Sequence, residues 1–99
     1  MERTNEKDAK DFYSAVLELK TVQECRAFFE DVCTIKELQE LVRRFHVAVL
    51  LAQGNNYMEI SDQTGVSSAT ISRVNRCLVY GDGGYSTVIS RLGEEEKND

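Results

Sequence analysis

The stretch Asn56–Tyr80, NYMEISDQTGVSSATISRVNRCLVY, decides the fold of this chain. It holds two short segments with apolar residues at helical spacing, separated by a single glycine. In a helix-turn-helix the first helix buries an apolar residue beside a small one, the turn favours glycine, and the second helix buries apolar residues over two turns. The residues that meet these requirements are Ile60 and Ser61, then Gly65, then Val66, Ile71 and Val74. The stretch therefore predicts a helix-turn-helix whose second helix runs from Ser67 to about Val79.

The second helix of this hairpin presents a face of small and basic residues. No Asp or Glu occurs between Gly65 and Gly81, although the whole chain has 17 acidic and only 12 basic residues. Small side chains let a helix enter the major groove, hydroxyl groups suit phosphate oxygens, and an arginine pairs with guanine through two hydrogen bonds. The predicted DNA contacts are Ser67, Ser68, Ala69, Thr70, Ser72, Arg73 and Arg76, together with Tyr57 on the preceding helix. The alternative is an amphipathic hairpin without a DNA-binding role, which the acid-free face disfavours.

Three helix starts carry a Thr or Asn followed three residues later by Glu, a pattern that caps a helix N-terminus. The pairs are Thr21 and Glu24, Thr34 and Glu37, and Asn56 and Glu59. They predict, after a first helix over residues 8–19, a second helix from Thr21 and a long third helix from Thr34 to about Ala52. The third helix is apolar over so much of its surface that more than one neighbour has to cover it.

The whole chain is predicted to form one all-α domain, because 99 residues support a single modest core. The helices of residues 8–53 come first, and the helix-turn-helix occupies residues 56–79. Residues 80–92 are predicted to form a loop and a short C-terminal helix over residues 85–92, and residues 93–99 a solvated acidic tail. The sequence shows no strand pattern and no internal repeat.

The formal net charge of −5 does not suit a strong nonspecific nucleic-acid binder, which normally has a basic stripe. The acid is concentrated at the two ends, however. Residues 34–80 contain five basic and four acidic residues, a net charge of +1, whereas residues 1–33 and 81–99 are each −3. We therefore expect weak nonspecific DNA binding, with more of the affinity coming from matched contacts.

Several other classes of protein are disfavoured. Cys25, Cys33 and Cys77 have no paired spacing and His46 is the only histidine, so we predict no metal site and interpret the cysteines as buried free thiols of a reducing cytoplasm. The Gly81–Gly84 loop lacks the Lys-Ser/Thr of a phosphate-binding loop, and no nucleophile and base are paired, so we expect no enzyme activity. No apolar run approaches the ~20 residues of a membrane span, which predicts a cytoplasmic protein without a membrane partner.

The run Ala69–Arg73, with Gly65 before it and the long Thr34-capped helix upstream, resembles the Trp repressor. The following run Val74–Tyr85, VNRCLVYGDGGY, is similar to Trp-repressor-like proteins of the YerC/YecD type. The resemblance spans about residues 8–92. It implies an all-helical, intertwined homodimer in which residues 8–53 are the dimerisation helices. A symmetric dimer would place its two reading helices roughly 34 Å apart on palindromic double-stranded DNA.

The resemblance also suggests a ligand site. The Trp repressor holds its ligand between two arginines, and gapless matching puts these at Arg43 and Arg73, with Cys77 where that family has a serine. Val74 replaces a small residue there, so tryptophan binding is not carried over, and a small-molecule corepressor stays an open expectation. As alternatives, Arg43 and Arg44 form an ordinary surface pair with Glu40 or Asp62, and Arg73 binds a DNA phosphate.

These observations predict a sequence-specific transcriptional regulator, a repressor, without a cofactor of its own. Two other interpretations stay open. A helical protein-interaction module derived from a DNA-binding fold would suit the net charge of −5. A replication-related DNA-binding protein would use the same hairpin on origin DNA, and the sequence does not separate it from a transcriptional regulator.

Overall fold

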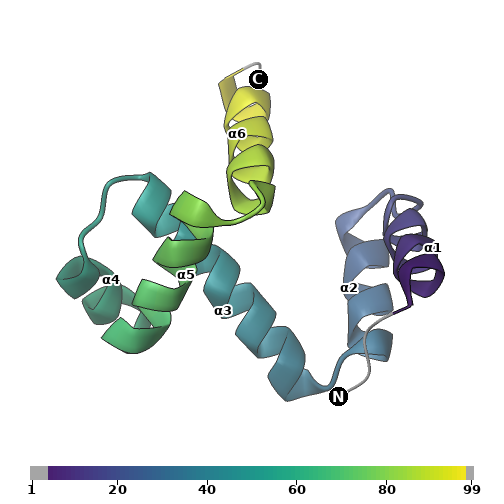
Figure 1. Ribbon diagram of the computed structural model, residues 1–99, viewed down its shortest axis with the longest axis horizontal. Coiled ribbons are helices and arrows are strands. Elements are labelled where there is room, and N and C mark those ends of the chain that lie inside the picture. Colours follow the sequence, from purple (N-terminus) through teal and green to yellow (C-terminus); the bar gives the residue numbers. More distant parts are fainter. Residues whose placement is uncertain (1–4, 98–99) are drawn as a thin grey trace. The chain divides into compact units, whose positions relative to one another are not determined.

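The computed structural model describes residues 5–97 and, within them, side chains as far as Glu95. These residues form six α-helices and no strand, which confirms the predicted all-α fold (Figure 1). The helices are α1 (Glu6–Val16), α2 (Val22–Val32), α3 (Ile35–Ala52), α4 (Tyr57–Thr64), α5 (Ser68–Tyr80) and α6 (Gly84–Lys97). The chain divides into an N-terminal unit ending at Leu38 and a C-terminal unit beginning at Gln39, so the division falls inside α3.

The predicted capping residues form the helix starts. At α3, the Thr34 hydroxyl accepts the Glu37 N–H at 3.1 Å, and the Glu37 carboxylate accepts the Thr34 N–H at 2.8 Å. Asn56 and Glu59 make the same reciprocal pair at α4. At α2 the arrangement differs, because Glu24 accepts the N–H of Lys20 instead of that of Thr21. Each pair satisfies backbone donors that a helix N-terminus otherwise leaves unpaired.

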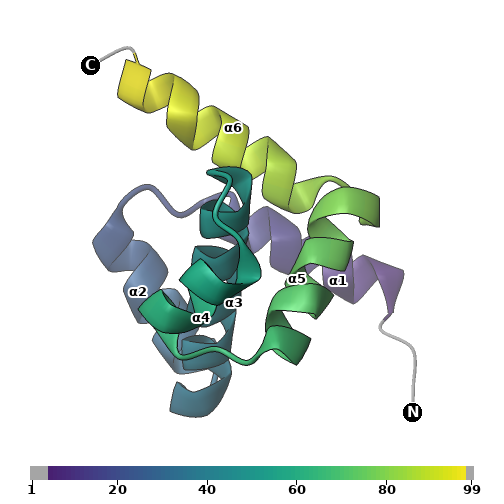
Figure 2. The same cartoon turned by 90° about the vertical axis from the view of Figure 1, so that its left-hand side faces the viewer.

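The core of the C-terminal unit is formed where α3, α4 and α5 meet. Figure 2 shows α4 in front of α3 and α5 to the right of them, with α6 continuing from the end of α5. The buried residues are Val47, Ala48 and Leu50 of α3, Ile60 of α4, Val66 of the turn, and Ile71 and Val74 of α5. Tyr85 and Ile89 of α6 pack against this cluster, and the Tyr85 ring stacks on Phe45 with 6.5 Å between the ring centroids.

Within one chain the long helix α3 is only partly enclosed. Its C-terminal half supplies three core residues, which pack against α4 and α5, but Leu41 and Val42, earlier in the helix, are 46% and 62% exposed. The apolar residues of α3 are thus covered by this chain only where α4 and α5 reach them. Large apolar side chains left exposed in this way are candidates for an interface with another chain.

Two predicted helix ends were wrong. The first helix ends at Val16 instead of Leu19, and the chain passes through a short turn to the α2 cap. The last helix runs from Gly84 to Lys97, so the predicted acidic tail is helical over residues 93–97, while residues 98–99 lie outside the described part of the chain. Gly93 lowers helix propensity by about 1 kcal/mol relative to Ala, but glutamate is a good helix former, so the helix already formed before Gly93 extends through the acidic run.

The N-terminal unit carries an aromatic cluster but buries none of the side chains of α1 or α2. Phe12 of α1 stacks on Phe28 of α2 with ring centroids 5.9 Å apart, and Phe29 packs edge-on against Phe28 at 5.4 Å. These contacts hold α1 to α2. They leave Leu17 and Val22 largely exposed, at 84% and 77%.

The prediction that the three cysteines are buried was wrong. Cys25 and Cys77 are exposed and Cys33 is half-buried, and all three are free thiols. Within residues 5–97, no helix combines the length and the apolar character that crossing a bilayer demands.

Candidate nucleic-acid interface

The turn between α4 and α5 is built by a glycine and a threonine. Gly65 ends α4 in the left-handed conformation with φ of 73°, and its N–H donates to the Ser61 carbonyl at 2.8 Å. The Thr64 hydroxyl donates to the Ile60 carbonyl at 2.7 Å and accepts the Val66 N–H at 3.1 Å. Glycine is the residue for which a positive φ costs least. Backbone and side chain together fix the direction in which α5 leaves the turn.

The burial pattern of α5 determines which face it presents to solvent. Ile71 is fully buried and Val74 is 2% exposed, one helical turn further on. Both side chains pack into the cluster with Ile60 and Val47, so this face is fixed against α3 and α4. The opposite face therefore points outward, and it carries the residues predicted to contact DNA.

Every predicted DNA-contact residue lies in the hairpin with its side chain accessible. Ser67, Ser68, Ala69, Ser72, Arg73 and Arg76 are exposed, Thr70 is half-buried, and Tyr57 at the start of α4 is 38% exposed. Ser67 is the N-cap of α5, where its Oγ accepts the Thr70 N–H at 3.3 Å. The hairpin thus brings hydroxyls, a methyl-bearing alanine and two arginines together on one helix.

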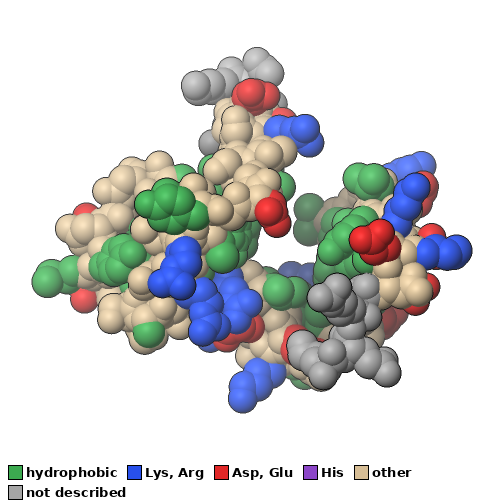
Figure 3. All heavy atoms as spheres, viewed as in Figure 1, with side chains coloured by type: hydrophobic (Ala, Val, Ile, Leu, Met, Phe, Trp, Pro, Cys, Tyr) green, Lys and Arg blue, Asp and Glu red, His purple; other side chains and the backbone are tan. Residues whose placement is uncertain are grey.

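Positive charge gathers beside this helix. Figure 3 shows Lys and Arg side chains next to one another where α5 passes α3, with an acidic side chain close by. On α3, Glu40 lies 3.6 Å from an Arg43 nitrogen and 3.7 Å from the Arg44 Nε. Glu40 is thus the partner of both arginines, one of the two candidates that the sequence suggested. Asp62 takes part in no ion pair within the described residues.

Two hollows lie on the C-terminal unit. The first, of about 330 Å³, is polar and lies between α3 and the start of α5, where it is lined by Glu40, Arg43, Thr64, Gly65, Val66, Ser67 and Thr70. The second, of about 590 Å³, is mainly apolar and is lined by Phe45, Cys77, Gly81, Asp82, Gly84, Tyr85 and Val88. Within the described residues, these two hollows do not bring together the residues predicted to hold a ligand. Arg43 lines the first, Cys77 lines the second, and Arg73 lines neither.

Two features of this region escaped the sequence analysis. No role was predicted for Thr64, yet its hydroxyl bridges the end of α4 and the start of the turn. A Thr directly before a turn glycine is a usable signal, because its hydroxyl readily bonds a nearby backbone group. The apolar hollow beside Tyr85 was also missed, since it depends on how α6 leaves the Gly81–Gly84 loop and no local pattern encodes that direction.

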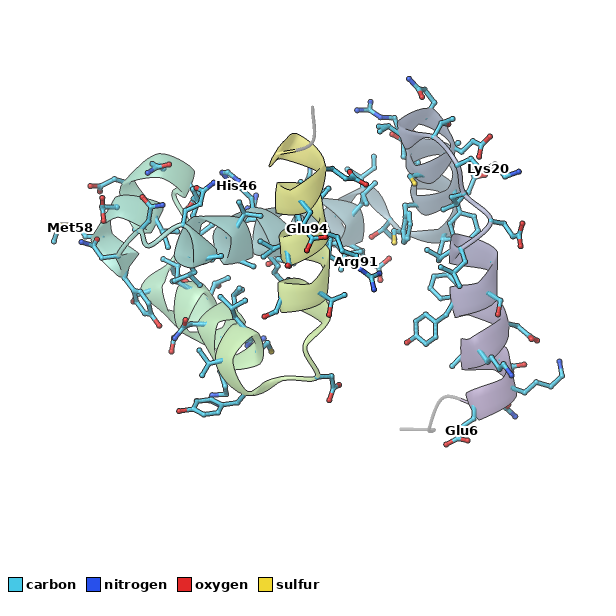
Figure 4. All side chains as sticks on the ribbon, turned by 90° about the horizontal axis from the view of Figure 1, so that it is seen from above. Glu6, Lys20, His46, Met58, Arg91 and Glu94 are labelled. Carbon is cyan, nitrogen blue, oxygen red and sulfur yellow. The ribbon has the colours of Figure 1, made fainter. Side chains whose placement is uncertain are left out.

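The chemistry of the described side chains is that of a binding surface. No three His, Cys, Asp or Glu residues gather as metal ligands within the part of the chain that the structure describes. His46 is exposed on the side of α3 near α4, apart from the acidic Glu94 of α6, as Figure 4 shows.

Comparison with known proteins gives a consistent picture. Residues 7–93 match the family model described as Trp repressor protein. The chain is 46% identical over 90 residues to the uncharacterised protein YerC of Bacillus subtilis, covering 91% of this chain and 86% of that protein. A TrpR-like protein from Eubacterium eligens shares the fold with a TM-score of 0.84 and 48% identity, covering 88% and 90% of the two chains. A candidate Trp repressor from Staphylococcus aureus matches with a TM-score of 0.85 and 37% identity, covering 90% and 89%.

Proposed function

Since the chain belongs to the Trp repressor family, whose members are regulators rather than enzymes, we propose that it is a sequence-specific DNA-binding transcriptional regulator and acts as a repressor. The observation that carries the proposal is the exposed, acid-free face of α5 on a helix-turn-helix whose inner face is buried. A helix placed in this way enters the major groove with its N-terminal residues toward the base edges. The protein would act in the cytoplasm, at the nucleoid when bound.

Within this proposal the residues of α5 have separate tasks. Ser67 and Ser68, at the start of the helix, would bind phosphate oxygens through hydroxyl and backbone N–H groups. Ala69 and the Thr70 methyl would meet a thymine methyl, and Arg76 would pair with guanine. Arg73 would bind a phosphate. The phosphate contacts of Ser67, Ser68 and Arg73 would set the affinity for DNA of any sequence. The contacts with base edges would set the operator sequence.

The proposed regulator is an intertwined homodimer. The support is the amount of apolar surface that one chain leaves uncovered: no side chain of α1 or α2 is buried, and Leu41 and Val42 of α3 are exposed. A second copy that interlocks with these helices would cover them. Two-fold symmetry then requires a palindromic operator, with half-sites about one turn of the duplex apart.

A small-molecule effector that switches DNA binding is a further part of the proposal, without the assumption that it is tryptophan. Buried Val74 occupies space against the core where the resemblance implies a small residue. Arg43 lines the polar hollow and Arg73 lines neither of the two hollows described above, so these hollows give no support to a ligand held between two arginines as in the Trp repressor.

The experiment that tests the proposed function is selection on random duplex DNA with the purified protein. It is carried out at about 50 and about 200 mM salt, because binding through phosphate contacts weakens strongly between these concentrations. Recovery of a palindrome with half-sites about one turn apart would support it and would supply the operator. Recovery of nothing, also when a metabolite mixture is present, would contradict it. Salt-insensitive binding to a protein partner in place of DNA would favour the interaction-module interpretation.

A further inference from the structure

Three charged side chains on α3 form a compact group beside the proposed reading helix. Glu40 lies within 4 Å of both Arg43 and Arg44, at 3.6 and 3.7 Å, and all three side chains are between 39% and 51% exposed. The Arg44 Nε is shielded from solvent and makes no hydrogen bond, because the Glu40 oxygen at 3.7 Å is beyond hydrogen-bond distance. The carboxylate is therefore shared loosely between two cations and binds neither tightly.

This group faces the proposed DNA-binding surface. Glu40 and Arg43 line the polar hollow of about 330 Å³ whose other wall is the turn and the start of α5, including Gly65, Ser67 and Thr70. The carboxylate consequently stands next to the segment proposed to approach phosphate oxygens. A fixed negative charge at this position opposes a phosphate there, and it also occupies the arginines that would attract one.

Resting on the proposed function, we infer that Glu40 is a built-in counter-ion that withholds Arg43 and Arg44 from DNA phosphates and so limits affinity for DNA of any sequence. Ion pairs of this exposure contribute little to stability, so the group is not needed to hold α3 together. Phosphate contacts raise affinity for every sequence alike, whereas base contacts discriminate. Pairing with Glu40 keeps the two arginines from contacting phosphates. This lowers the affinity for nonspecific DNA and raises the share of the operator affinity that comes from base contacts.

The inference explains how an arginine-bearing surface fits a chain with a net charge of −5. Of the five basic residues in residues 34–80, two are Arg73 and Arg76 on α5 and two are the arginines beside Glu40. A regulator that searches a genome gains from weak nonspecific binding, because nonspecific sites vastly outnumber operators.

The test is binding of Glu40→Gln to an arbitrary duplex of fixed sequence, which requires no knowledge of the operator. Fluorescence anisotropy over a series of salt concentrations gives the affinity and the slope of log K against log salt. One gained phosphate contact is expected to tighten binding about tenfold at low salt, to steepen the slope by about one, and to shrink the gain roughly three- to fourfold on a fourfold rise in salt. Glu94→Gln on α6 changes the net charge equally and is the matched control.

The double variants Glu40→Gln/Arg43→Ala and Glu40→Gln/Arg44→Ala decide whether the gain passes through the arginines, and at least one of them should return to the affinity of wild type. Circular dichroism melting checks that each variant is folded. A Glu40→Gln gain no larger than that of Glu94→Gln, or one that survives both double substitutions, would overturn the inference while wild-type binding still supported the proposed function. Absence of binding to the arbitrary duplex by wild type and Glu40→Gln alike would also overturn the inference, whereas the proposed function is tested separately by the selection on random duplex DNA.

Discussion

Arg76 and Arg91 are both exposed. Arg76 lies on the proposed reading helix α5, whereas Arg91 lies on α6 (Figure 4). We expect Arg76→Ala to weaken operator binding by about 1–3 kcal/mol and to relax specificity at one position, because a base pair would lose its bidentate partner. Titration of labelled operator variants measures both effects. Arg91→Ala removes the same charge and should change affinity far less. Equal losses for the two variants would exclude Arg76 from base contact.

Glu37 connects a single side chain to the pH dependence of folding. The Thr34 backbone N–H, and then the Thr34 hydroxyl, lower the pKa of the Glu37 carboxyl from its ordinary value of 4.5. A carboxyl whose pKa is lower in the folded state stabilises that state above its unfolded pKa, and the contribution is lost as the pH falls through the folded pKa. At neutral pH the melting temperature of wild type should therefore be higher than that of Glu37→Gln. The difference between the two melting temperatures should narrow as the pH falls below 4.5.

The matched melting series needs only circular dichroism from pH 7 downward. Gln keeps a side-chain oxygen that caps the helix, so the comparison isolates the charge. A gap between the two melting temperatures that stays constant across this range would show that the charge of Glu37 contributes nothing to folding.

At the scale of the elements, substitution of Gly65 and of Gly93 by alanine should change the free energy of unfolding in opposite directions. Gly65 has a φ of 73° and a Cβ added there would meet no atom within 4 Å, so Gly65→Ala costs only backbone strain, about 1–2 kcal/mol. Gly93 lies inside α6 with equally open space, so Gly93→Ala should stabilise by about 0.5–1 kcal/mol through helix propensity. Urea unfolding of the two variants measures both signs. A neutral Gly65→Ala would show that the turn tolerates another backbone conformation.

The starts of the helices could be predicted because their signals are local. Asn56 with Glu59 and Thr34 with Glu37 form the expected caps, and Ile71 and Val74 are buried as the hairpin pattern requires. The end of α6 could not, since a Gly followed by a run of like charges is typical of a solvated tail, and the continuation of the helix depends on the turns already formed before Gly93. Which side of α3 carries uncovered apolar residues likewise depends on how far α4 and α5 extend, and this is settled only in three dimensions.

The same distinction holds for the candidate site. Helical periodicity places the outward residues of α5, from Ser67 to Arg76, on one face, and the structure shows them accessible. Sequence alone left two carboxylates, Glu40 and Asp62, as partners for the arginines of α3, because spacing along a helix and proximity across the hairpin are equally reasonable. Only the positions of the side chains show that Glu40 takes both arginines.

On the scale of the whole molecule, more large hydrophobic side chains are exposed than hydrophobic side chains are buried among the described residues. Seven hydrophobic side chains are buried within the described residues, all from position 47 onward, whereas fourteen large hydrophobic ones are exposed. Exposed apolar residues occur singly on any protein, but neighbouring helices with no buried residue are typical of surfaces that another chain covers. Helices α1 and α2 are such a pair.

This uncovered surface gives a prediction for Phe28, whose ring holds α1 and α2 together by stacking on Phe12 and contacting Phe29. A carboxylate there has to be desolvated in a dimer interface without a partner, so Phe28→Asp should abolish the proposed homodimer. Analytical ultracentrifugation should find wild type at twice the mass of one chain. Because interlocked chains fold and assemble together, the variant should also lose helicity, and the melting temperature of wild type should rise with concentration. Gln23→Asp introduces the same charge on the exposed side of α2 and should remain dimeric. A Phe28→Asp monomer that keeps the full helical signal would contradict the interlocked architecture, since its helices would then need no second copy to stay folded.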